Sequence, residues 1–155
     1  MKRIRRDRRR RAFTLLEVLL VAGILALLAA FAVPALMKQA DKAKIGIATA
    51  AVGRNGPIAK GLDNFRFDIG RYPDTSEGLA ALFKAPSGLD DEGKWKGPYI
   101  EGTPEELRDP WDNEYEYKSP GEVNESSYDL WSRGLDGKDD GGKEGSDDIK
   151  NWRDK

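Results

Sequence analysis

The sequence has 155 residues with a formal net charge of −1, and it contains neither cysteine nor histidine. A disulfide is therefore excluded, as are catalysis by a histidine side chain and zinc sites that use imidazole. The length predicts one domain in addition to a membrane segment.

The positive charge is concentrated at the start of the chain. Residues 1–11 carry eight Lys or Arg and one Asp, a net of +7, which leaves −8 for the remainder. Residues 13–37 follow as an apolar run, which as a helix would span about 37 Å, enough for the apolar core of a bilayer. A basic flank before such a helix predicts a cytoplasmic N-terminus and an extracytoplasmic remainder. The apolar run directly after the arginines disfavours a nucleic-acid patch, and it is too long for an ordinary secretory signal.

One ionisable residue, Glu17, lies inside the apolar run. No charged residue occurs from Val18 to Val33. Placing an ionisable side chain in a membrane costs about 2.5–3.5 kcal/mol, so such a residue indicates a functional role by default. Glu17 is therefore the first candidate functional residue.

The helical pattern continues beyond the apolar run. Apolar residues at spacings of three and four through Val52 predict an amphipathic extension, and Pro34 is expected to kink the helix rather than end it. Residues 53–57 contain two glycines, an asparagine and a proline, which predict either a kink or a true interruption. A second helix is expected from about Pro57 to Asp68, because proline is favourable in a first helical turn.

The central part of the chain predicts a short helix and a small sheet. Thr75 or Ser76 is expected to cap the short helix. Strand-like runs over residues 114–118 and 127–132 predict an antiparallel hairpin or meander. Because only about 100 residues lie outside the membrane, this sheet must pack on the helix of residues 38–68 to bury enough area.

The C-terminal segment is acidic and rich in glycine, a composition typical of a disordered tail. Its clustered carboxylates would repel one another unless a cation lay among them, and oxygen ligands on a flexible loop favour Ca²⁺ over Mg²⁺. The sequence leaves open a calcium loop or a solvated charge run, while Ile149 and Trp152 supply an apolar anchor behind it. The carboxylates form two groups, Asp136, Asp139 and Asp140, and then Asp147 and Asp148.

Residue patterns for catalysis are absent from the sequence. It has no Ser–His–Asp set, no cysteine nucleophile, no Gly-x-Ser-x-Gly and no glycine-rich phosphate loop in a strand–helix context. Its paired carboxylates lie in the acidic tail, where a general acid would lack the apolar pocket that raises its pKa. An enzyme is therefore not expected.

The junction at residues 11–18, RAFTLLEV, resembles the class III signal of type IV pilin-like proteins. In that superfamily a prepilin peptidase cuts on the cytoplasmic side of the apolar run and methylates the new N-terminus. The resemblance implies cleavage between Ala12 and Phe13, methylation of Phe13, and assembly roles for Glu17 and Pro34. Ala12 departs from the family pattern, which usually has glycine before the cut.

Later motifs resemble one branch of that superfamily, the major pseudopilins of the type II secretion system. They are GRYP at 70–73, GPYI at 97–100, DPWDN at 109–113 and the ending SRGLDG…SDDIKNW. The resemblance implies an α+β pilin-like fold, in which a long N-terminal helix packs on a small antiparallel sheet, with a calcium loop at 133–148. The implied Ca²⁺ ligands are the side chains of Asp136, Asp147 and Asp148 and the carbonyls of Arg133 and Ser146.

The resemblance also implies a function and a location. Residues 1–12 would be a cleaved cytoplasmic leader, 13–37 a transmembrane and then filament-core helix, and 38–155 a periplasmic domain. The chain would be a structural subunit in the inner membrane of a Gram-negative bacterium. It would polymerise into a periplasmic pseudopilus that drives folded exoproteins through an outer-membrane secretin. The implied partners are other copies, minor pseudopilins, prepilin peptidase and an assembly platform with a cytoplasmic ATPase.

Two other functions are compatible with the residues. One is a major type IV pilin for adhesion or DNA uptake, although many such pilins carry a C-terminal cysteine pair, which this sequence lacks. The other is a membrane-anchored calcium-binding periplasmic protein whose signal is not cleaved.

Overall fold

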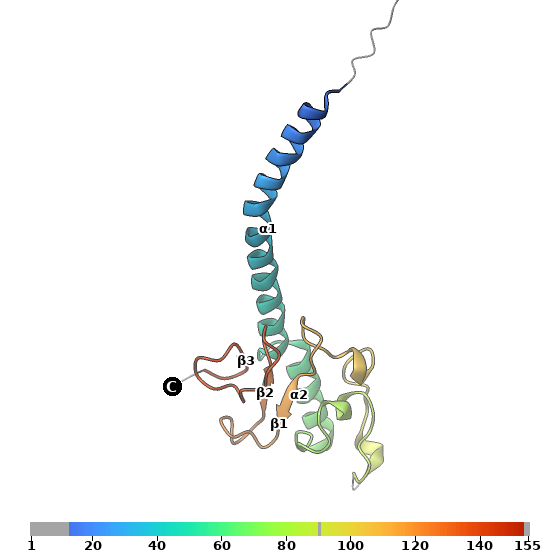
Figure 1. The fold of residues 1–155 in the computed structure, drawn as a ribbon. Helices are drawn as coiled ribbons and strands as arrows, with labels where there is room; N and C mark the ends of the chain where they lie inside the picture. Colours follow the sequence, from blue (N-terminus) through green and yellow to red (C-terminus); the bar gives the residue numbers. More distant parts are fainter. Residues whose placement is uncertain (1–12, 90, 154–155) are drawn as a thin grey trace, which may run out of the picture. The chain divides into compact units, whose positions relative to one another are not determined.

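The structure, a computed structural model, describes residues 13–89 and 91–153. The chain divides between Ala40 and Asp41 into two compact units, each of which is considered by itself. The predicted leader, including Ala12, lies outside the described residues. The first unit contains the N-terminal part of helix α1, and the second contains its C-terminal part and all other elements (Figure 1).

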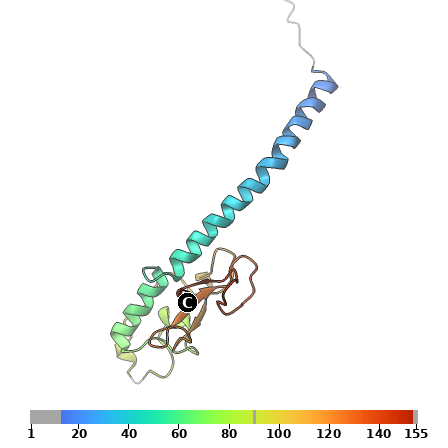
Figure 2. The ribbon, with the colours of Figure 1, turned by 90° about the vertical axis from the view of Figure 1, so that its left-hand side faces the viewer.

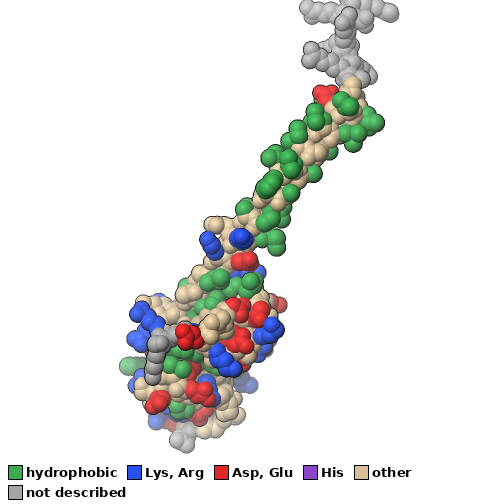
Figure 3. Space-filling model, turned by 60° about the vertical axis from the view of Figure 1, so that its left-hand side comes forward, with side chains coloured by type: hydrophobic (Ala, Val, Ile, Leu, Met, Phe, Trp, Pro, Cys, Tyr) green, Lys and Arg blue, Asp and Glu red, His purple; other side chains and the backbone are tan. Residues whose placement is uncertain are grey.

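Helix α1 runs without interruption over Leu15–Val52, as the apolar periodicity predicts. Thr14 precedes it, and the Thr14 hydroxyl accepts the Glu17 N–H at 3.2 Å, which satisfies one of the free donors of the first turn. Pro34 lies inside the helix and does not end it. In the first unit the large apolar side chains are exposed, and hydrophobic side chains lie along the whole visible length of this part of the helix (Figure 3).

The break at residues 53–57 is a true interruption, because α1 ends at Val52 and helix α2 begins at Pro57 and ends at Ile69. Gly56 is required there: a Cβ atom would lie 2.4 Å from the carbonyl oxygens of both Ala50 and Ala51. The chain therefore turns back tightly against the last carbonyls of α1. The predicted second helix is confirmed to within one residue.

Three short strands form an antiparallel sheet in the order β1-β2-β3: β1 Glu116–Lys118, β2 Asp129–Ser132 and β3 Ile149–Lys150. The first two strands confirm the predicted meander, with Tyr117 opposite Leu130. The third strand was not predicted. It contains Ile149, one of the two residues of the predicted apolar anchor, and it pairs with the end of β2.

The core of the second unit lies between α2 and the sheet (Figure 2). Phe65, Ile58 and Leu62 of α2 are fully buried and belong to one cluster with Leu130 of β2. Val52 of α1 joins the same cluster. The predicted packing of the sheet on the helices is confirmed for the part of the helix that lies in this unit.

The predicted short helix is instead a four-residue 3₁₀ helix, η1 Leu79–Leu82, and its predicted cap was wrong. The Thr75 hydroxyl donates to the Ser119 carbonyl and accepts the Ser119 N–H, both at 3.0 Å, so it is not available to cap a helix. Two further 3₁₀ turns are η2 Glu92–Lys94 and η3 Pro104–Glu106.

A bidentate ion pair fixes the chain between α2 and η1. Arg71 donates from Nη1 to Glu77 Oε2 at 2.6 Å and from Nη2 to Glu77 Oε1 at 2.8 Å. The Asp74 N–H donates to the same carboxylate at 2.7 Å. The side-chain hydrogen bond from Arg71 lowers the pKa of Glu77 below its usual value of 4.5, although burial opposes this.

Phe65 and Phe67 form a matched test of the core, because one is fully buried and the other is 88% exposed on the same helix. Phe65→Ala should lower the free energy of unfolding by about 3–5 kcal/mol, and Phe67→Ala should change it by less than about 0.5 kcal/mol. Chemical denaturation of the full chain in detergent, followed by circular dichroism, measures both. Equal losses would contradict the described core.

Glu77→Gln should lower the melting temperature of the full chain at pH 7. A carboxyl whose pKa is depressed on folding stabilises the fold above its unfolded pKa, and that contribution is lost as the pH falls through the folded pKa. The difference between wild type and variant should therefore shrink as the pH falls below 4.5. Glu105→Gln, at an exposed position, is the control. A difference that is independent of pH would exclude the ion pair as its source.

Candidate metal site and assembly helix

The N-terminal part of α1 presents an apolar surface with one carboxylate. Glu17 lies in the first turn, and Phe13, just before the helix, is 79% exposed. Both border a surface depression of about 350 Å³, which is otherwise lined by apolar side chains: Val18, Val21, Ala22 and Leu25. By length and composition, the helical region from Leu15 contains a stretch apolar enough to cross a membrane, a property that signal sequences share.

The acidic C-terminal loop brings three carboxylates together. One oxygen each from Asp140, Asp147 and Asp148 can be chosen so that all three lie within 4.8 Å of one another. Asp148 is buried, Asp140 is half-buried and Asp147 is exposed. The group therefore opens to solvent on one side and reaches into the fold on the other.

Asp148 is the buried member of this group. Its Oδ2 accepts the Gly142 N–H at 2.7 Å, whereas its Oδ1, among the described residues, is a buried oxygen without a hydrogen-bond partner. Burial, with the nearby carboxylates of Asp139 and Asp140, raises the pKa of Asp148 above its usual range. A carboxylate that is buried, crowded and incompletely paired is suited to a cation.

Asp136, a predicted ligand, does not belong to that three-carboxylate group. Its carboxylate accepts the Lys138 N–H and the Lys138 Nζ, each at 2.8 Å. The Lys138 ammonium accordingly lowers the pKa of Asp136. The Asp136 N–H donates to Asp147 Oδ2 at 2.8 Å, so the residue contacts the cluster through its backbone.

The three-carboxylate group contains Asp140, whereas Asp136 of the predicted ligand set lies outside it, and the ligand role of Asp136 stays a prediction. The sequence did show Asp140 among the clustered carboxylates, and no helical or strand periodicity on a glycine-rich loop could indicate which members meet. The roles predicted for the Arg133 and Ser146 carbonyls stay predictions. The Arg133 side chain is paired with Glu116 of β1, and the Ser146 hydroxyl donates to the Lys143 carbonyl at 2.7 Å.

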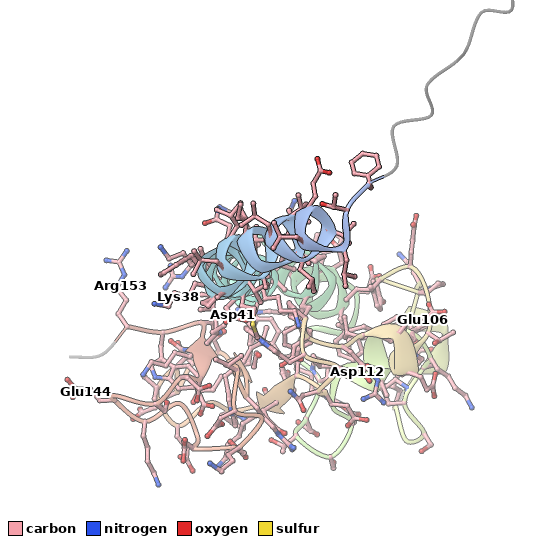
Figure 4. All side chains as sticks on the ribbon, turned by 45° about the horizontal axis from the view of Figure 1, so that its top comes forward. Lys38, Asp41, Glu106, Asp112, Glu144 and Arg153 are labelled. Carbon is pink, nitrogen blue, oxygen red and sulfur yellow. The ribbon has the colours of Figure 1, made fainter. Side chains whose placement is uncertain are left out.

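Two tryptophans hold the loop against the sheet. The predicted anchor, Ile149 and Trp152, is confirmed, because Ile149 packs against the core and Trp152 contacts Trp131. Trp131 Nε1 donates to Asp139 Oδ1 at 3.0 Å, and the Trp131 ring meets the edge of Trp152 at 5.9 Å between centroids. A Cβ atom on Gly142 would lie 2.2 Å from the Trp152 ring, so the loop backbone packs directly on the indole. Glu144, farther along the loop, points away from the unit (Figure 4).

The residues present fit a calcium ion better than other common cations. All three side chains of the cluster offer carboxylate oxygens, and the described cluster contains no nitrogen or sulfur ligand. Gly141 and Gly142 after Asp140 and Gly145 before Asp147 leave the loop the freedom that the irregular coordination of Ca²⁺ requires. The three carboxylates of this loop therefore form a group that could hold a metal ion.

Comparison with known proteins finds one family match for the N-terminal segment and another for the rest of the chain. Residues 35–152 match the family described as "Type II secretion system (T2SS), protein G". Residues 7–33 match the "Prokaryotic N-terminal methylation motif". The second match includes the junction at which cleavage is predicted.

Individual relatives agree with the family match. The type II secretion system core protein G of Pseudomonas aeruginosa is 41% identical over 146 residues, which cover 94% of this chain and 96% of the relative. The corresponding protein of Vibrio cholerae is 36% identical over 149 residues, with 96% of each chain covered.

A solved structure shares the fold and the family. The crystal structure of the major pseudopilin from the type 2 secretion system of enterohaemorrhagic Escherichia coli matches with a TM-score of 0.60 and 32% identity. The match covers 76% of this chain and 89% of that one. With a long N-terminal helix, a small antiparallel sheet and no catalytic residue pattern, the chain belongs to the non-enzymatic family of type II secretion system core protein G, the major pseudopilins.

Proposed function

We propose that this chain is cleaved between Ala12 and Phe13, is held in the inner membrane by α1, and then polymerises into a periplasmic pseudopilus that moves exoproteins through the secretin. The observation that carries this proposal is the exposed apolar surface of α1 with Glu17 in its first turn. By family membership, the expected partners are other copies, minor pseudopilins, prepilin peptidase and an assembly platform with its ATPase.

The apolar surface of α1 supports both stages. The large apolar residues from Phe13 to Met37 are each at least half exposed, so this part of the chain does not form the core of the folded unit. Lipid covers such a surface in a membrane, and helices of other subunits cover it in a filament. Moving between these surroundings costs little apolar burial, since lipid tails and packed side chains are both apolar.

Glu17 supplies the specificity that apolar packing lacks. Cleavage before Phe13 creates an α-amino group, and a Glu17 carboxylate buried in a filament needs a cation of that kind. An unpaired buried charge costs about 3–5 kcal/mol, so a subunit placed in the wrong axial register would be rejected. We propose that the Glu17 carboxylate pairs with the α-amino group of Phe13 on an adjacent subunit.

The acidic loop is proposed to bind Ca²⁺ through Asp140, Asp147 and Asp148. When bound, the ion supplies the positive charge that allows three carboxylates to remain close together. This chain has no disulfide, and a small domain of this kind gains stability from a metal that closes a loop. β3 follows the loop directly, so the ion would also secure the edge of the sheet.

Glu17→Gln should insert into the membrane and be cleaved, but it should not form filaments, because the amide cannot neutralise the neighbouring amino group. Mass spectrometry of the N-terminus checks processing to a methylated Phe13, and electron microscopy of sheared filaments checks assembly. Glu144→Gln, at an exposed site, is the matched control. Normal filaments from the Glu17 variant would exclude the proposed pair.

Calcium at one hundred times its Kd should add about 2.7 kcal/mol to the free energy of unfolding of the full chain in detergent. The melting temperature should rise accordingly. Asp148→Asn should abolish this response. In the absence of calcium, however, the same variant should melt above wild type, since it removes a buried charge that Asp139 and Asp140 repel. A wild-type chain with no calcium response would overturn the metal assignment.

A further inference from the structure

A buried carboxylate, Asp109, organises the turn before β1. Asp109 is 5% exposed. Its Oδ1 accepts the backbone N–H groups of Trp111 and Asn113, each at 2.9 Å. These bonds close the turn and leave Oδ2 directed toward β2, where it accepts the Ser132 hydroxyl at 2.6 Å.

Ser132 connects the Asp109 carboxylate to the start of the acidic loop through hydrogen bonds of its hydroxyl. It is fully buried at the end of β2, so water does not compete for its hydroxyl. Because the hydroxyl hydrogen is donated to Asp109, a lone pair of the same oxygen is free to accept the Gly134 N–H, at 3.2 Å. The position of Gly134 is thus fixed from the folded core.

Gly134 in turn packs directly against Asp147. Its φ is +66°, and a Cβ atom at this position would lie 2.2 Å from the Asp147 carbonyl oxygen and 2.8 Å from Asp147 Oδ2. Only glycine allows this approach. Any displacement of Gly134 would therefore move the Asp147 carboxylate relative to Asp140 and Asp148.

We propose that Asp109, Ser132 and Gly134 are positioning residues that hold Asp147 at the metal cluster before an ion arrives. The inference rests on the calcium binding proposed above. Three carboxylates within 4.8 Å repel one another, so an unsupported Asp147 on a glycine-rich loop would move outward. A fixed Asp147 reduces the ordering that binding requires, and supporting groups of this kind typically change metal affinity by about 10–100-fold.

The alternative is that Asp109 and Ser132 stabilise the fold without affecting the ion. Asp129 provides the matched control for this alternative. It is also buried, at 3% exposed, and it accepts the backbone N–H groups of Val123 and Asn124 at 2.8 and 2.9 Å. Asp129 therefore organises a different loop, between β1 and β2, with the same chemistry.

The test compares calcium affinity with thermal stability for the full chain in detergent, using Ca²⁺ alone as the probe. Isothermal titration gives the Kd, and circular dichroism gives the metal-free melting temperature. Ser132→Ala and Asp109→Asn should weaken calcium binding at least about tenfold. Asp129→Asn should lower the melting temperature by a similar amount but leave the Kd within about twofold of wild type, since it has no bond to the acidic loop.

A glycine pair separates the contact with Asp147 from backbone strain. Gly134→Ala should weaken calcium binding at least as much as Ser132→Ala. Gly70→Ala also places alanine at a positive φ, +91°, but its Cβ meets no atom within 4 Å, and its Kd should match wild type.

The outcomes separate the two proposals. A wild-type chain that binds no calcium overturns both the metal site and this inference. A wild-type chain that binds calcium, with unchanged affinity in Ser132→Ala, Asp109→Asn and Gly134→Ala, overturns the positioning role alone. An affinity loss that is equal in Asp129→Asn does the same, because it reports general destabilisation.

Discussion

The exposed apolar surface of α1 is the constraint on which the rest of the chain depends. Large apolar side chains from Phe13 to Met37 must be covered by lipid or by other helices, because water disfavours them by about 25 cal/mol for each Å² exposed. Such packing alone is tolerant of axial shifts between helices. We propose that the single carboxylate of Glu17, in the first turn, makes one arrangement of neighbouring subunits preferable to others.

The second unit is a small domain without disulfides, so its stability depends on other interactions. Its core is built by Phe65 and Leu62 of α2 against Leu130 of β2, and buried polar groups then connect that core to the surface loops. Asp109 and Asp129 each hold a loop through backbone N–H groups. For the acidic loop, we propose that a bound ion, rather than backbone N–H groups, holds the carboxylates in place.

Sequence periodicity was sufficient for the helices and the first two strands, because α1, α2 and the β1–β2 meander are encoded by local patterns. It was insufficient for β3, whose two residues are a strand only through pairing with Ser132 and Trp131 of β2. The predicted cap, Thr75 or Ser76, was wrong: Gly78 precedes η1, and the Thr75 hydroxyl bonds instead to Ser119, far away in the sequence. In the acidic loop, the folded backbone brings the Asp140 carboxylate to those of Asp147 and Asp148, and the ligand role predicted for Asp136 stays a prediction.

We propose that Glu17 couples the membrane helix to filament assembly through the new N-terminus of a neighbour. A cryo-electron microscopy structure of filaments formed by this chain tests it most directly. The account predicts a methylated Phe13 at the N-terminus, with its amino nitrogen within about 4 Å of the Glu17 carboxylate of an adjacent subunit, inside the apolar core. Filaments that retain residues 1–12, or in which Glu17 faces solvent, would contradict it.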